Sequence, residues 1–129
     1  MATVMPVKGS CWEGSGPWLL ARVVGQAGSA VTQASLSSIT CKVFDLQGAA
    51  PGTAVSEPTV TISSAVFDSL QTDARWTEDA TGYNFAHQVA SSVVADGGHA
   101  YRVEYKFTPA SGQTFYVVFE VHASDVRSE

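Results

Sequence analysis

The last third of the chain alternates apolar and polar residues with a period of two, and this pattern constrains the fold most strongly. In residues 101–107 the odd positions are tyrosine, valine, tyrosine and phenylalanine, whereas the even positions are charged. Residues 115–121 place phenylalanine or valine at every odd position. Because successive side chains of a β-strand point to opposite faces, each segment predicts a strand with one buried face. The turn sequence between them, residues 108–113, completes a predicted β-hairpin with an aromatic inner face.

Shorter segments along the rest of the chain predict further strands. Residues 18–24, 36–46, 59–63 and 83–89 are short and rich in β-branched or aromatic residues, as strands are. About seven strands at this spacing predict an all-β domain, either a two-sheet sandwich or a barrel. Residues 96–101, Asp-Gly-Gly-His-Ala-Tyr, favour an immunoglobulin-like antiparallel sandwich, since a tyrosine that enters the penultimate strand is typical of its tyrosine corner.

Residues 1–16 have neither a strand period nor a helix period, and three glycines interrupt them. Their apolar content nevertheless argues against a solvated tail. We therefore divide the chain into an N-terminal arm, residues 1–16, and one sandwich domain, residues 17–129. The arm is expected to pack on its own domain or on a neighbouring molecule, and the alternative is a short extra strand. The apolar residues of the arm are Val4, Met5, Val7 and Trp12.

The charge balance excludes two classes of partner. The net charge is −5, and charged residues make up only 15% of the chain, against about 25% in typical soluble proteins. Lysine and arginine do not cluster, so we expect neither nucleic-acid binding nor attachment to an anionic membrane. The first residues lack the features of an export signal, which predicts a protein that is made and kept in a cytoplasm, or released from it by a non-secretory route. There Cys11 and Cys41 are expected to stay reduced, with a disulfide between them as the alternative.

Residues that often carry catalysis or bind metals are present, but without the required spacing. No serine lies in a Gly-x-Ser-x-Gly motif. No pair among His87, His99 and His122 has the spacing of metal ligands. The acidic residues 68–79 lack the pattern of a calcium-binding loop, and no glycine-rich phosphate loop occurs. We therefore predict no catalytic residues, no metal and no cofactor, and a protein that is not an enzyme.

A few aromatic and apolar residues occupy positions where polar ones are expected. Trp76 lies in a polar loop beside Arg75, where it could anchor the loop, fill a partner's pocket or stack on a sugar. Tyr116 and Val118 lie on the outer face of their predicted strand, which indicates a covering segment or an intermolecular contact. The candidate partner-binding residues are Val4, Met5, Val7, Trp12, Trp76, Tyr116 and Val118.

Five segments carry a resemblance to a known class of domain. They are residues 21–24 (Ala-Arg-Val-Val), 38–45 (Ser-Ile-Thr-Cys-Lys-Val-Phe-Asp), 82–85 (Gly-Tyr-Asn-Phe), 98–107 (Gly-His-Ala-Tyr-Arg-Val-Glu-Tyr-Lys-Phe) and 112–121 (Gly-Gln-Thr-Phe-Tyr-Val-Val-Phe-Glu-Val). Together they resemble small immunoglobulin-like domains of tailed-phage virion proteins, and the resemblance covers all but the two ends of the chain. Its motifs are structural, so they specify the fold better than the role.

Domains of this class serve as capsid decoration or cement proteins, or as baseplate or tail accessories. The resemblance therefore implies a non-enzymatic structural protein of a virion, most of all a capsid decoration protein, assembled in the host cytoplasm. Its implied partners are other virion proteins such as a major capsid protein, and further copies of itself in a homo-oligomer. The alternatives are a tail or baseplate accessory protein and a carbohydrate- or receptor-binding module.

Overall fold

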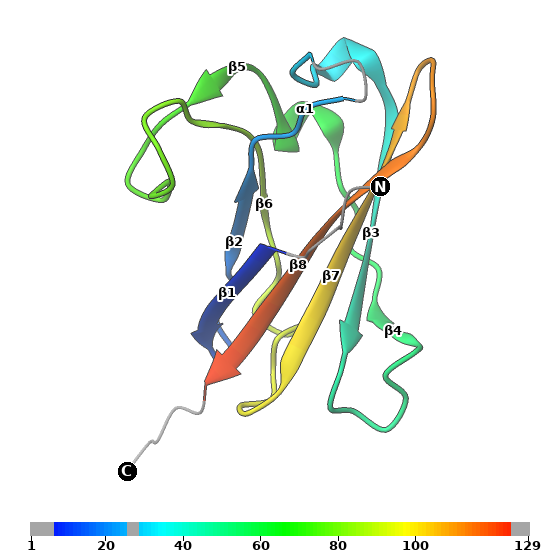
Figure 1. Cartoon of the computed structure of the whole chain (residues 1–129). Coiled ribbons are helices and arrows are strands. Elements are labelled where there is room, and N and C mark those ends of the chain that lie inside the picture. Colours follow the sequence, from blue (N-terminus) through cyan, green and yellow to red (C-terminus); the bar gives the residue numbers. More distant parts are fainter. Residues whose placement is uncertain (1–6, 26–28, 125–129) are drawn as a thin grey trace, which may run out of the picture.

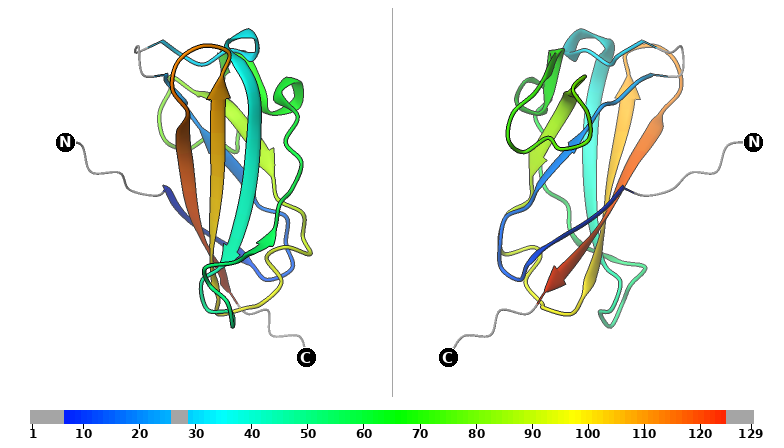
Figure 2. Two further views of the ribbon diagram at one scale, coloured as in Figure 1. Left: turned by 90° about the vertical axis from the view of Figure 1, so that its right-hand side faces the viewer. Right: turned by 60° about the vertical axis from the view of Figure 1, so that its left-hand side comes forward.

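The computed structural model describes residues 7–25 and 29–124, which form eight strands and two short helical turns (Figure 1). A five-stranded sheet has the order β1-β8-β7-β3-β4, and a three-stranded sheet has the order β2-β6-β5. The two sheets lie as separate layers (Figure 2). The elements are β1 (Val7–Trp12), β2 (Trp18–Ala21), η1 (Gln33–Ser35), β3 (Leu36–Asp45), β4 (Ala54–Ser56), α1 (Ile62–Ala65), β5 (Val66–Gln71), β6 (Tyr83–Gln88), β7 (Ala100–Pro109) and β8 (Phe115–Ser124).

The predicted hairpin forms the centre of the larger sheet. β7 and β8 pair antiparallel from Tyr101 opposite Val121 to Phe107 opposite Phe115. The odd-numbered residues of β7 face the core, where Tyr105 is fully buried. The prediction of an all-β domain with two sheets is confirmed, although the described residues contain eight strands rather than about seven. The expectation of purely antiparallel sheets is wrong for the larger sheet, because β1 pairs in parallel with β8.

The core lies between the inner faces of the two sheets. Phe85 of β6 packs edge-on against Tyr105 and Phe107 of β7, with ring centroids 4.8 and 5.4 Å apart. The Tyr105 hydroxyl lies 2.7 Å from Nδ1 of His87, so this half-buried histidine packs against the core. At the start of β7 the Tyr101 hydroxyl accepts a hydrogen bond from the Asp96 backbone N–H, at 3.0 Å. These contacts tie β7 to the opposite sheet and to its own preceding turn.

The described part of the predicted arm lies on its own domain. β1 pairs in parallel with β8, from Val7 opposite Phe119 to Trp12 opposite Ser124, and forms one edge of the larger sheet (Figure 2). The chain then crosses to the other layer through Gly14, which has a positive φ of 69° and donates its N–H to the Val94 carbonyl.

The predicted strand at residues 59–63 is wrong. Thr59 makes only a single β-bridge, and the Thr61 carbonyl then accepts the N–H of Ala65, which starts the turn α1. Val60 and Ile62 still pack against the core. The alternation in this segment therefore reflects one-sided burial, which a bend next to a sheet shares with a paired strand.

Both cysteines are free thiols. Cys11 lies on β1 and Cys41 on β3, with β8 and β7 between them in the same sheet. Burial raises the pKa of the Cys41 thiol to about 12. Cys41 is therefore an inert core residue.

Candidate functional site

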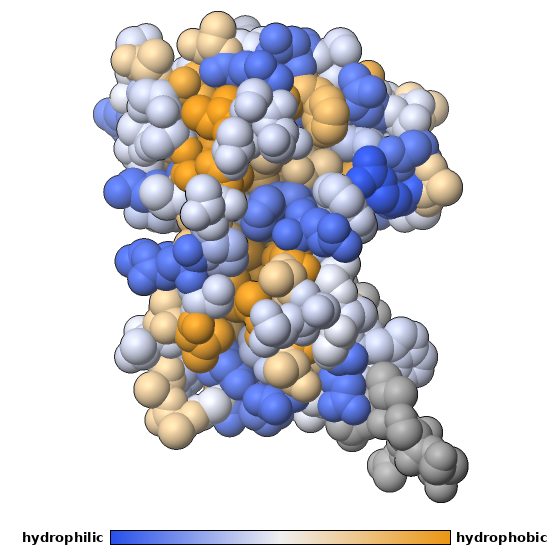
Figure 3. All heavy atoms as spheres, turned by 180° about the vertical axis from the view of Figure 1, so that it is seen from behind, coloured by the Kyte–Doolittle hydropathy of each residue, from blue (hydrophilic) through white to orange (hydrophobic). Residues whose placement is uncertain are grey.

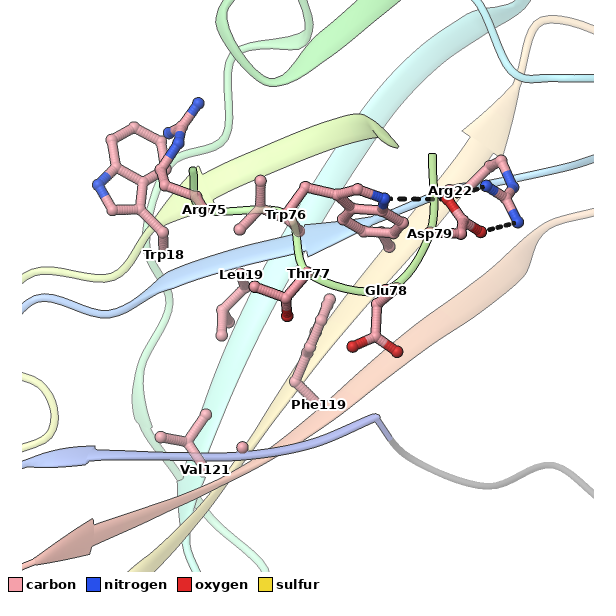
Figure 4. Close-up of a pocket in the computed structure, with 13 residues that line it drawn as sticks. Trp18, Leu19, Arg22, Arg75, Trp76, Thr77, Glu78, Asp79, Phe119 and Val121 are labelled. Carbon is pink, nitrogen blue, oxygen red and sulfur yellow. Dashed lines mark hydrogen bonds and ion pairs between the residues drawn. The ribbon is translucent and has the colours of Figure 1, made fainter. Parts of the chain in front are cut away.

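A cleft opens at one edge of the two layers, where β2 of the smaller sheet faces β1 and β8 of the larger one (Figure 4). It encloses about 750 Å³. One wall is β2 together with residues 75–79 of the loop between β5 and β6. The apolar floor is formed by Leu19, Phe119 and Val121. We refer to this feature as the cleft.

Asp73 organises one end of the cleft wall. Its carboxylate accepts hydrogen bonds from the Tyr83 hydroxyl at 2.6 Å and from Nη2 of Arg75 at 2.8 Å. The Arg75 guanidinium lies over the ring of Trp18, 4.4 Å from its centroid. Arg75 holds the pKa of Asp73 well below its usual range, with a further contribution from Tyr83. One carboxylate thus fixes both the cation and the indole beneath it.

Asp79 organises the other end of the wall. Its carboxylate accepts a hydrogen bond from Nε1 of Trp76 at 3.0 Å and forms an ion pair with Arg22, whose Nη2 lies 2.9 Å away (Figure 4). The backbone N–H groups of Thr81 and Gly82 donate to the same carboxylate. Arg22 holds the pKa of Asp79 well below its usual range. The indole of Trp76 is therefore fixed in position before any ligand arrives.

Gly82 closes this loop onto β6 and has a positive φ of 104°. A Cβ built at Gly82 would lie 2.3 Å from the carbonyl oxygen of Gln71. Because real Cβ atoms do not approach backbone oxygens so closely, only glycine fits at this position.

Two polar side chains project from the wall into the cleft and take no part in the hydrogen bonds of Asp73 and Asp79. Thr77 and Glu78 both point toward the apolar floor (Figure 4). No described residue forms a hydrogen bond or an ion pair with the Glu78 carboxylate. Since Arg22 and Arg75 are neutralised by Asp79 and Asp73, Glu78 leaves the cleft with an excess of negative charge.

A second candidate surface is the side of the five-stranded sheet that faces away from the core, which we call the outer face. Phe115 and Val117 pack against the core, so Tyr116 and Val118 between and after them point outward. The exposed fraction of Tyr116 is 57%, and Val118 is half-buried. At the other end of the face, Trp12 is 62% exposed.

The predicted partner-binding residues thus divide between two surfaces. Trp76 lines the cleft, whereas Trp12, Tyr116 and Val118 lie on the outer face. Val7 begins β1, and Val4 and Met5 lie outside the described residues. The view opposite to that of Figure 1 shows apolar side chains in separate patches among polar ones (Figure 3).

Sequence reasoning missed most of the cleft. Trp18 begins the predicted strand at residues 18–24, where an aromatic residue usually packs into the core, yet 45% of its surface is exposed. Arg22 carried no local signal, since its partner Asp79 is 57 positions away, and Asp73 and Asp79 belong to the acidic residues 68–79, which lack the pattern of a calcium-binding loop. Only the neighbouring pair Arg75 and Trp76 marked the loop as unusual.

One group of titratable residues lies outside both surfaces. Asp45, Asp96 and His99 each place a potential ligand atom within 4.8 Å of the others. Nδ1 of His99 already lies 2.9 Å from both carboxylate oxygens of Asp45, which raises the pKa of His99. These groups bond to one another, and the expectation that the chain holds no metal stays a prediction.

Comparison of the chain with protein-family models, with curated proteins and with solved structures found no match. In the part of the chain that the structure describes, no helix is long and apolar enough to cross a membrane.

Proposed function

We propose that this chain is a non-enzymatic structural protein of a phage virion, most of all a capsid decoration protein, which assembles through the outer face. The observation that carries the proposal is the exposure of Trp12 and Tyr116 on one side of one sheet. Large aromatic side chains are enriched among residues that dominate protein interfaces. Val118 extends the apolar surface beside Tyr116.

The details of the fold support an immunoglobulin-like domain. The Tyr101 hydroxyl bonds back to the Asp96 backbone at the start of the penultimate strand, which is the geometry of a tyrosine corner. The larger sheet joins the last two strands to β3, and the smaller sheet joins β2, β6 and β5. This division of strands suits the class of virion domain that the sequence resembles.

The dimensions and charge of the outer face suit a protein contact. β3, β7 and β8 have ten residues each, β1 has six and β4 has three. At about 3.4 Å per residue and about 4.8 Å between strands, the five strands give a face of roughly 640 Å². A standard interface buries about 800 Å² on each partner. Charges on the face are partly neutralised, since Arg102 and Glu104 form an ion pair at 2.6 Å. Repetition of a weak contact over a shell raises its effective strength.

Sedimentation of a lysate from the culture that makes the protein naturally, followed by mass spectrometry of the fractions, tests this proposal. We expect the chain to travel with a megadalton particle, at a high and fixed copy number relative to the major shell protein. A low fixed copy number would contradict the decoration role and support a tail or baseplate accessory. Recovery only in the slow fractions would overturn the virion role itself.

A further inference from the structure

The cleft contains the components of a small-molecule site. Its volume of about 750 Å³ lies in the range of about 300–1,000 Å³ that is usual for ligand pockets. It combines an apolar floor with a few polar groups, and the indole of Trp76 forms part of its wall. Such pockets take ligands that have both an apolar face and hydrogen-bonding edges.

We propose that the cleft binds a neutral saccharide, with one sugar ring against Trp76 and its hydroxyl groups on Glu78 and Thr77. The C–H face of a pyranose ring is apolar and weakly positive, so it is attracted to the negative face of an indole. The hydroxyl groups at the edge of the same ring donate hydrogen bonds. The carboxylate of Glu78, which has no hydrogen-bond partner among the described residues, accepts them.

The charges of the cleft select among sugars. The two arginines at the cleft are held by Asp73 and Asp79, so neither offers a free cation to a sugar acid. Glu78, which forms no ion pair with residues 7–25 or 29–124, adds a negative charge that repels a carboxylate or a sulfate ester. The cleft therefore favours uncharged sugars over uronic, sialic or sulfated ones.

The wall is preorganised for this ligand. Trp76 is held by its hydrogen bond to Asp79 and packs against Tyr83, with ring centroids 5.7 Å apart. Trp18 is held by the Arg75 guanidinium above its ring. Binding then costs little additional ordering of side chains, and a rigid site gains affinity in this way. The saccharide site does not depend on a role in the virion.

Titration of the full chain with maltotriose, cellotriose and chitotriose, followed by tryptophan fluorescence and calorimetry, tests the inference. We expect at least one of the three neutral trisaccharides to bind saturably, with a Kd of order 1 mM or below. Trigalacturonate, which is acidic, is expected not to bind. Absence of saturable binding by all three neutral sugars, or tighter binding of trigalacturonate, would overturn the inference.

Two variants and one control locate the site. Trp76→Ala is expected to weaken binding by about tenfold or more, as loss of a central aromatic contact does. Glu78→Gln tests the cleft without disturbing the loop network, because Glu78 has no described partner, and we expect a clear loss of affinity. The control Trp12→Ala removes an exposed tryptophan from the outer face and is expected to leave binding unchanged. Binding that survives both cleft variants, or that is lost in the control, would contradict this assignment.

Discussion

The cleft wall and the outer face both expose large aromatic side chains, but they hold them in different ways. Trp76 is fixed by Asp79, which also binds Arg22 and two backbone N–H groups. On the outer face, Tyr116 projects from a regular strand, and no described residue hydrogen-bonds to its hydroxyl. The cleft is thus a rigid, concave arrangement suited to a small ligand, whereas the outer face is a broad surface suited to another protein.

This difference has a consequence for stability. The cleft wall depends on irregular backbone and on polar contacts between residues that are distant in sequence, so single substitutions there remove several contacts at once. Residues exposed on a regular strand make few contacts within the domain. The two regions should therefore respond very differently to mutation.

The largest effect is expected for Gly82→Ala, which places a Cβ 2.3 Å from the Gln71 carbonyl oxygen. We expect a loss of about 4 kcal/mol in the free energy of unfolding, measured by urea denaturation, because the backbone must move. The matched control is Gly112→Ala, which has nearly the same φ, 102°, with no atom near the new Cβ. It should lose only about 1–2 kcal/mol. Equal losses would show that the close approach at Gly82 carries no cost.

The next effect is expected for Asn84→Ala, behind the cleft wall. The buried amide of Asn84 accepts a hydrogen bond from the Val23 N–H and donates to the carbonyls of Val23 and Val31. Its removal leaves buried backbone groups without partners, and we expect a loss of about 3 kcal/mol in urea unfolding. Gln88→Ala on the same strand removes one exposed hydrogen bond to Gly16 and should cost about 0.5 kcal/mol. A similar cost for both would contradict this role of Asn84.

Acid should weaken the cleft wall through the carboxylates of Asp73 and Asp79, which are held in ion pairs with Arg75 and Arg22. The pKa values of Asp73 and Asp79 lie below their unfolded value of about 4, so their stabilisation is present above that pH and is lost as the pH falls through the folded pKa. We expect the midpoint temperature of thermal unfolding to decrease once the pH is lowered below about 4. In Asp79→Asn this acid-dependent fall should be smaller.

The matched control for the acid prediction is Glu78→Gln, in the same loop. It removes a carboxylate that has no described partner, so its unfolding midpoint should keep the pH dependence of the wild type. If Asp79→Asn and the wild type lost the same stability between pH 5 and pH 2, the ion pair with Arg22 would not contribute to the fold.

The smallest effect on the isolated domain is expected for Tyr116→Ser on the outer face. Because Tyr116 is 57% exposed, the free energy of unfolding should change by no more than about 0.5 kcal/mol in urea denaturation. A loss of 2 kcal/mol or more would place Tyr116 among the residues that hold the domain together, and would remove the contrast with the cleft.

The parts of the fold that follow from local periodicity could be predicted from the sequence. β7 alternates apolar and charged residues from 101 to 107, β8 has phenylalanine or valine at every odd position from 115 to 121, and Pro109 and Gly112 mark the end of β7 and the turn that follows it. Residues 59–63 show the limit of this reasoning, since the same alternation there accompanies a bend rather than a paired strand.

The cleft could not be predicted, because its parts meet only through tertiary structure. Arg22 follows β2 and Asp79 precedes β6, and nothing in either segment identifies the other as its partner. β1 carries no clear alternation because Gly9 occupies one of its inward positions. The positions of Tyr116 and Val118, in contrast, followed directly from the strand period.

The most direct measurement of the central claim is the incorporation of outer-face variants into particles. Three versions of the chain would each be expressed in place of the natural one: the wild type, the double variant Tyr116→Ser/Val118→Ser, and Trp76→Ala. Mass spectrometry of purified particles would then give the copy number of the chain relative to the major shell protein. The account predicts at least a tenfold drop, in order of magnitude, for the double variant and an unchanged copy number for Trp76→Ala. Incorporation of the double variant at the wild-type copy number would contradict assembly through the outer face.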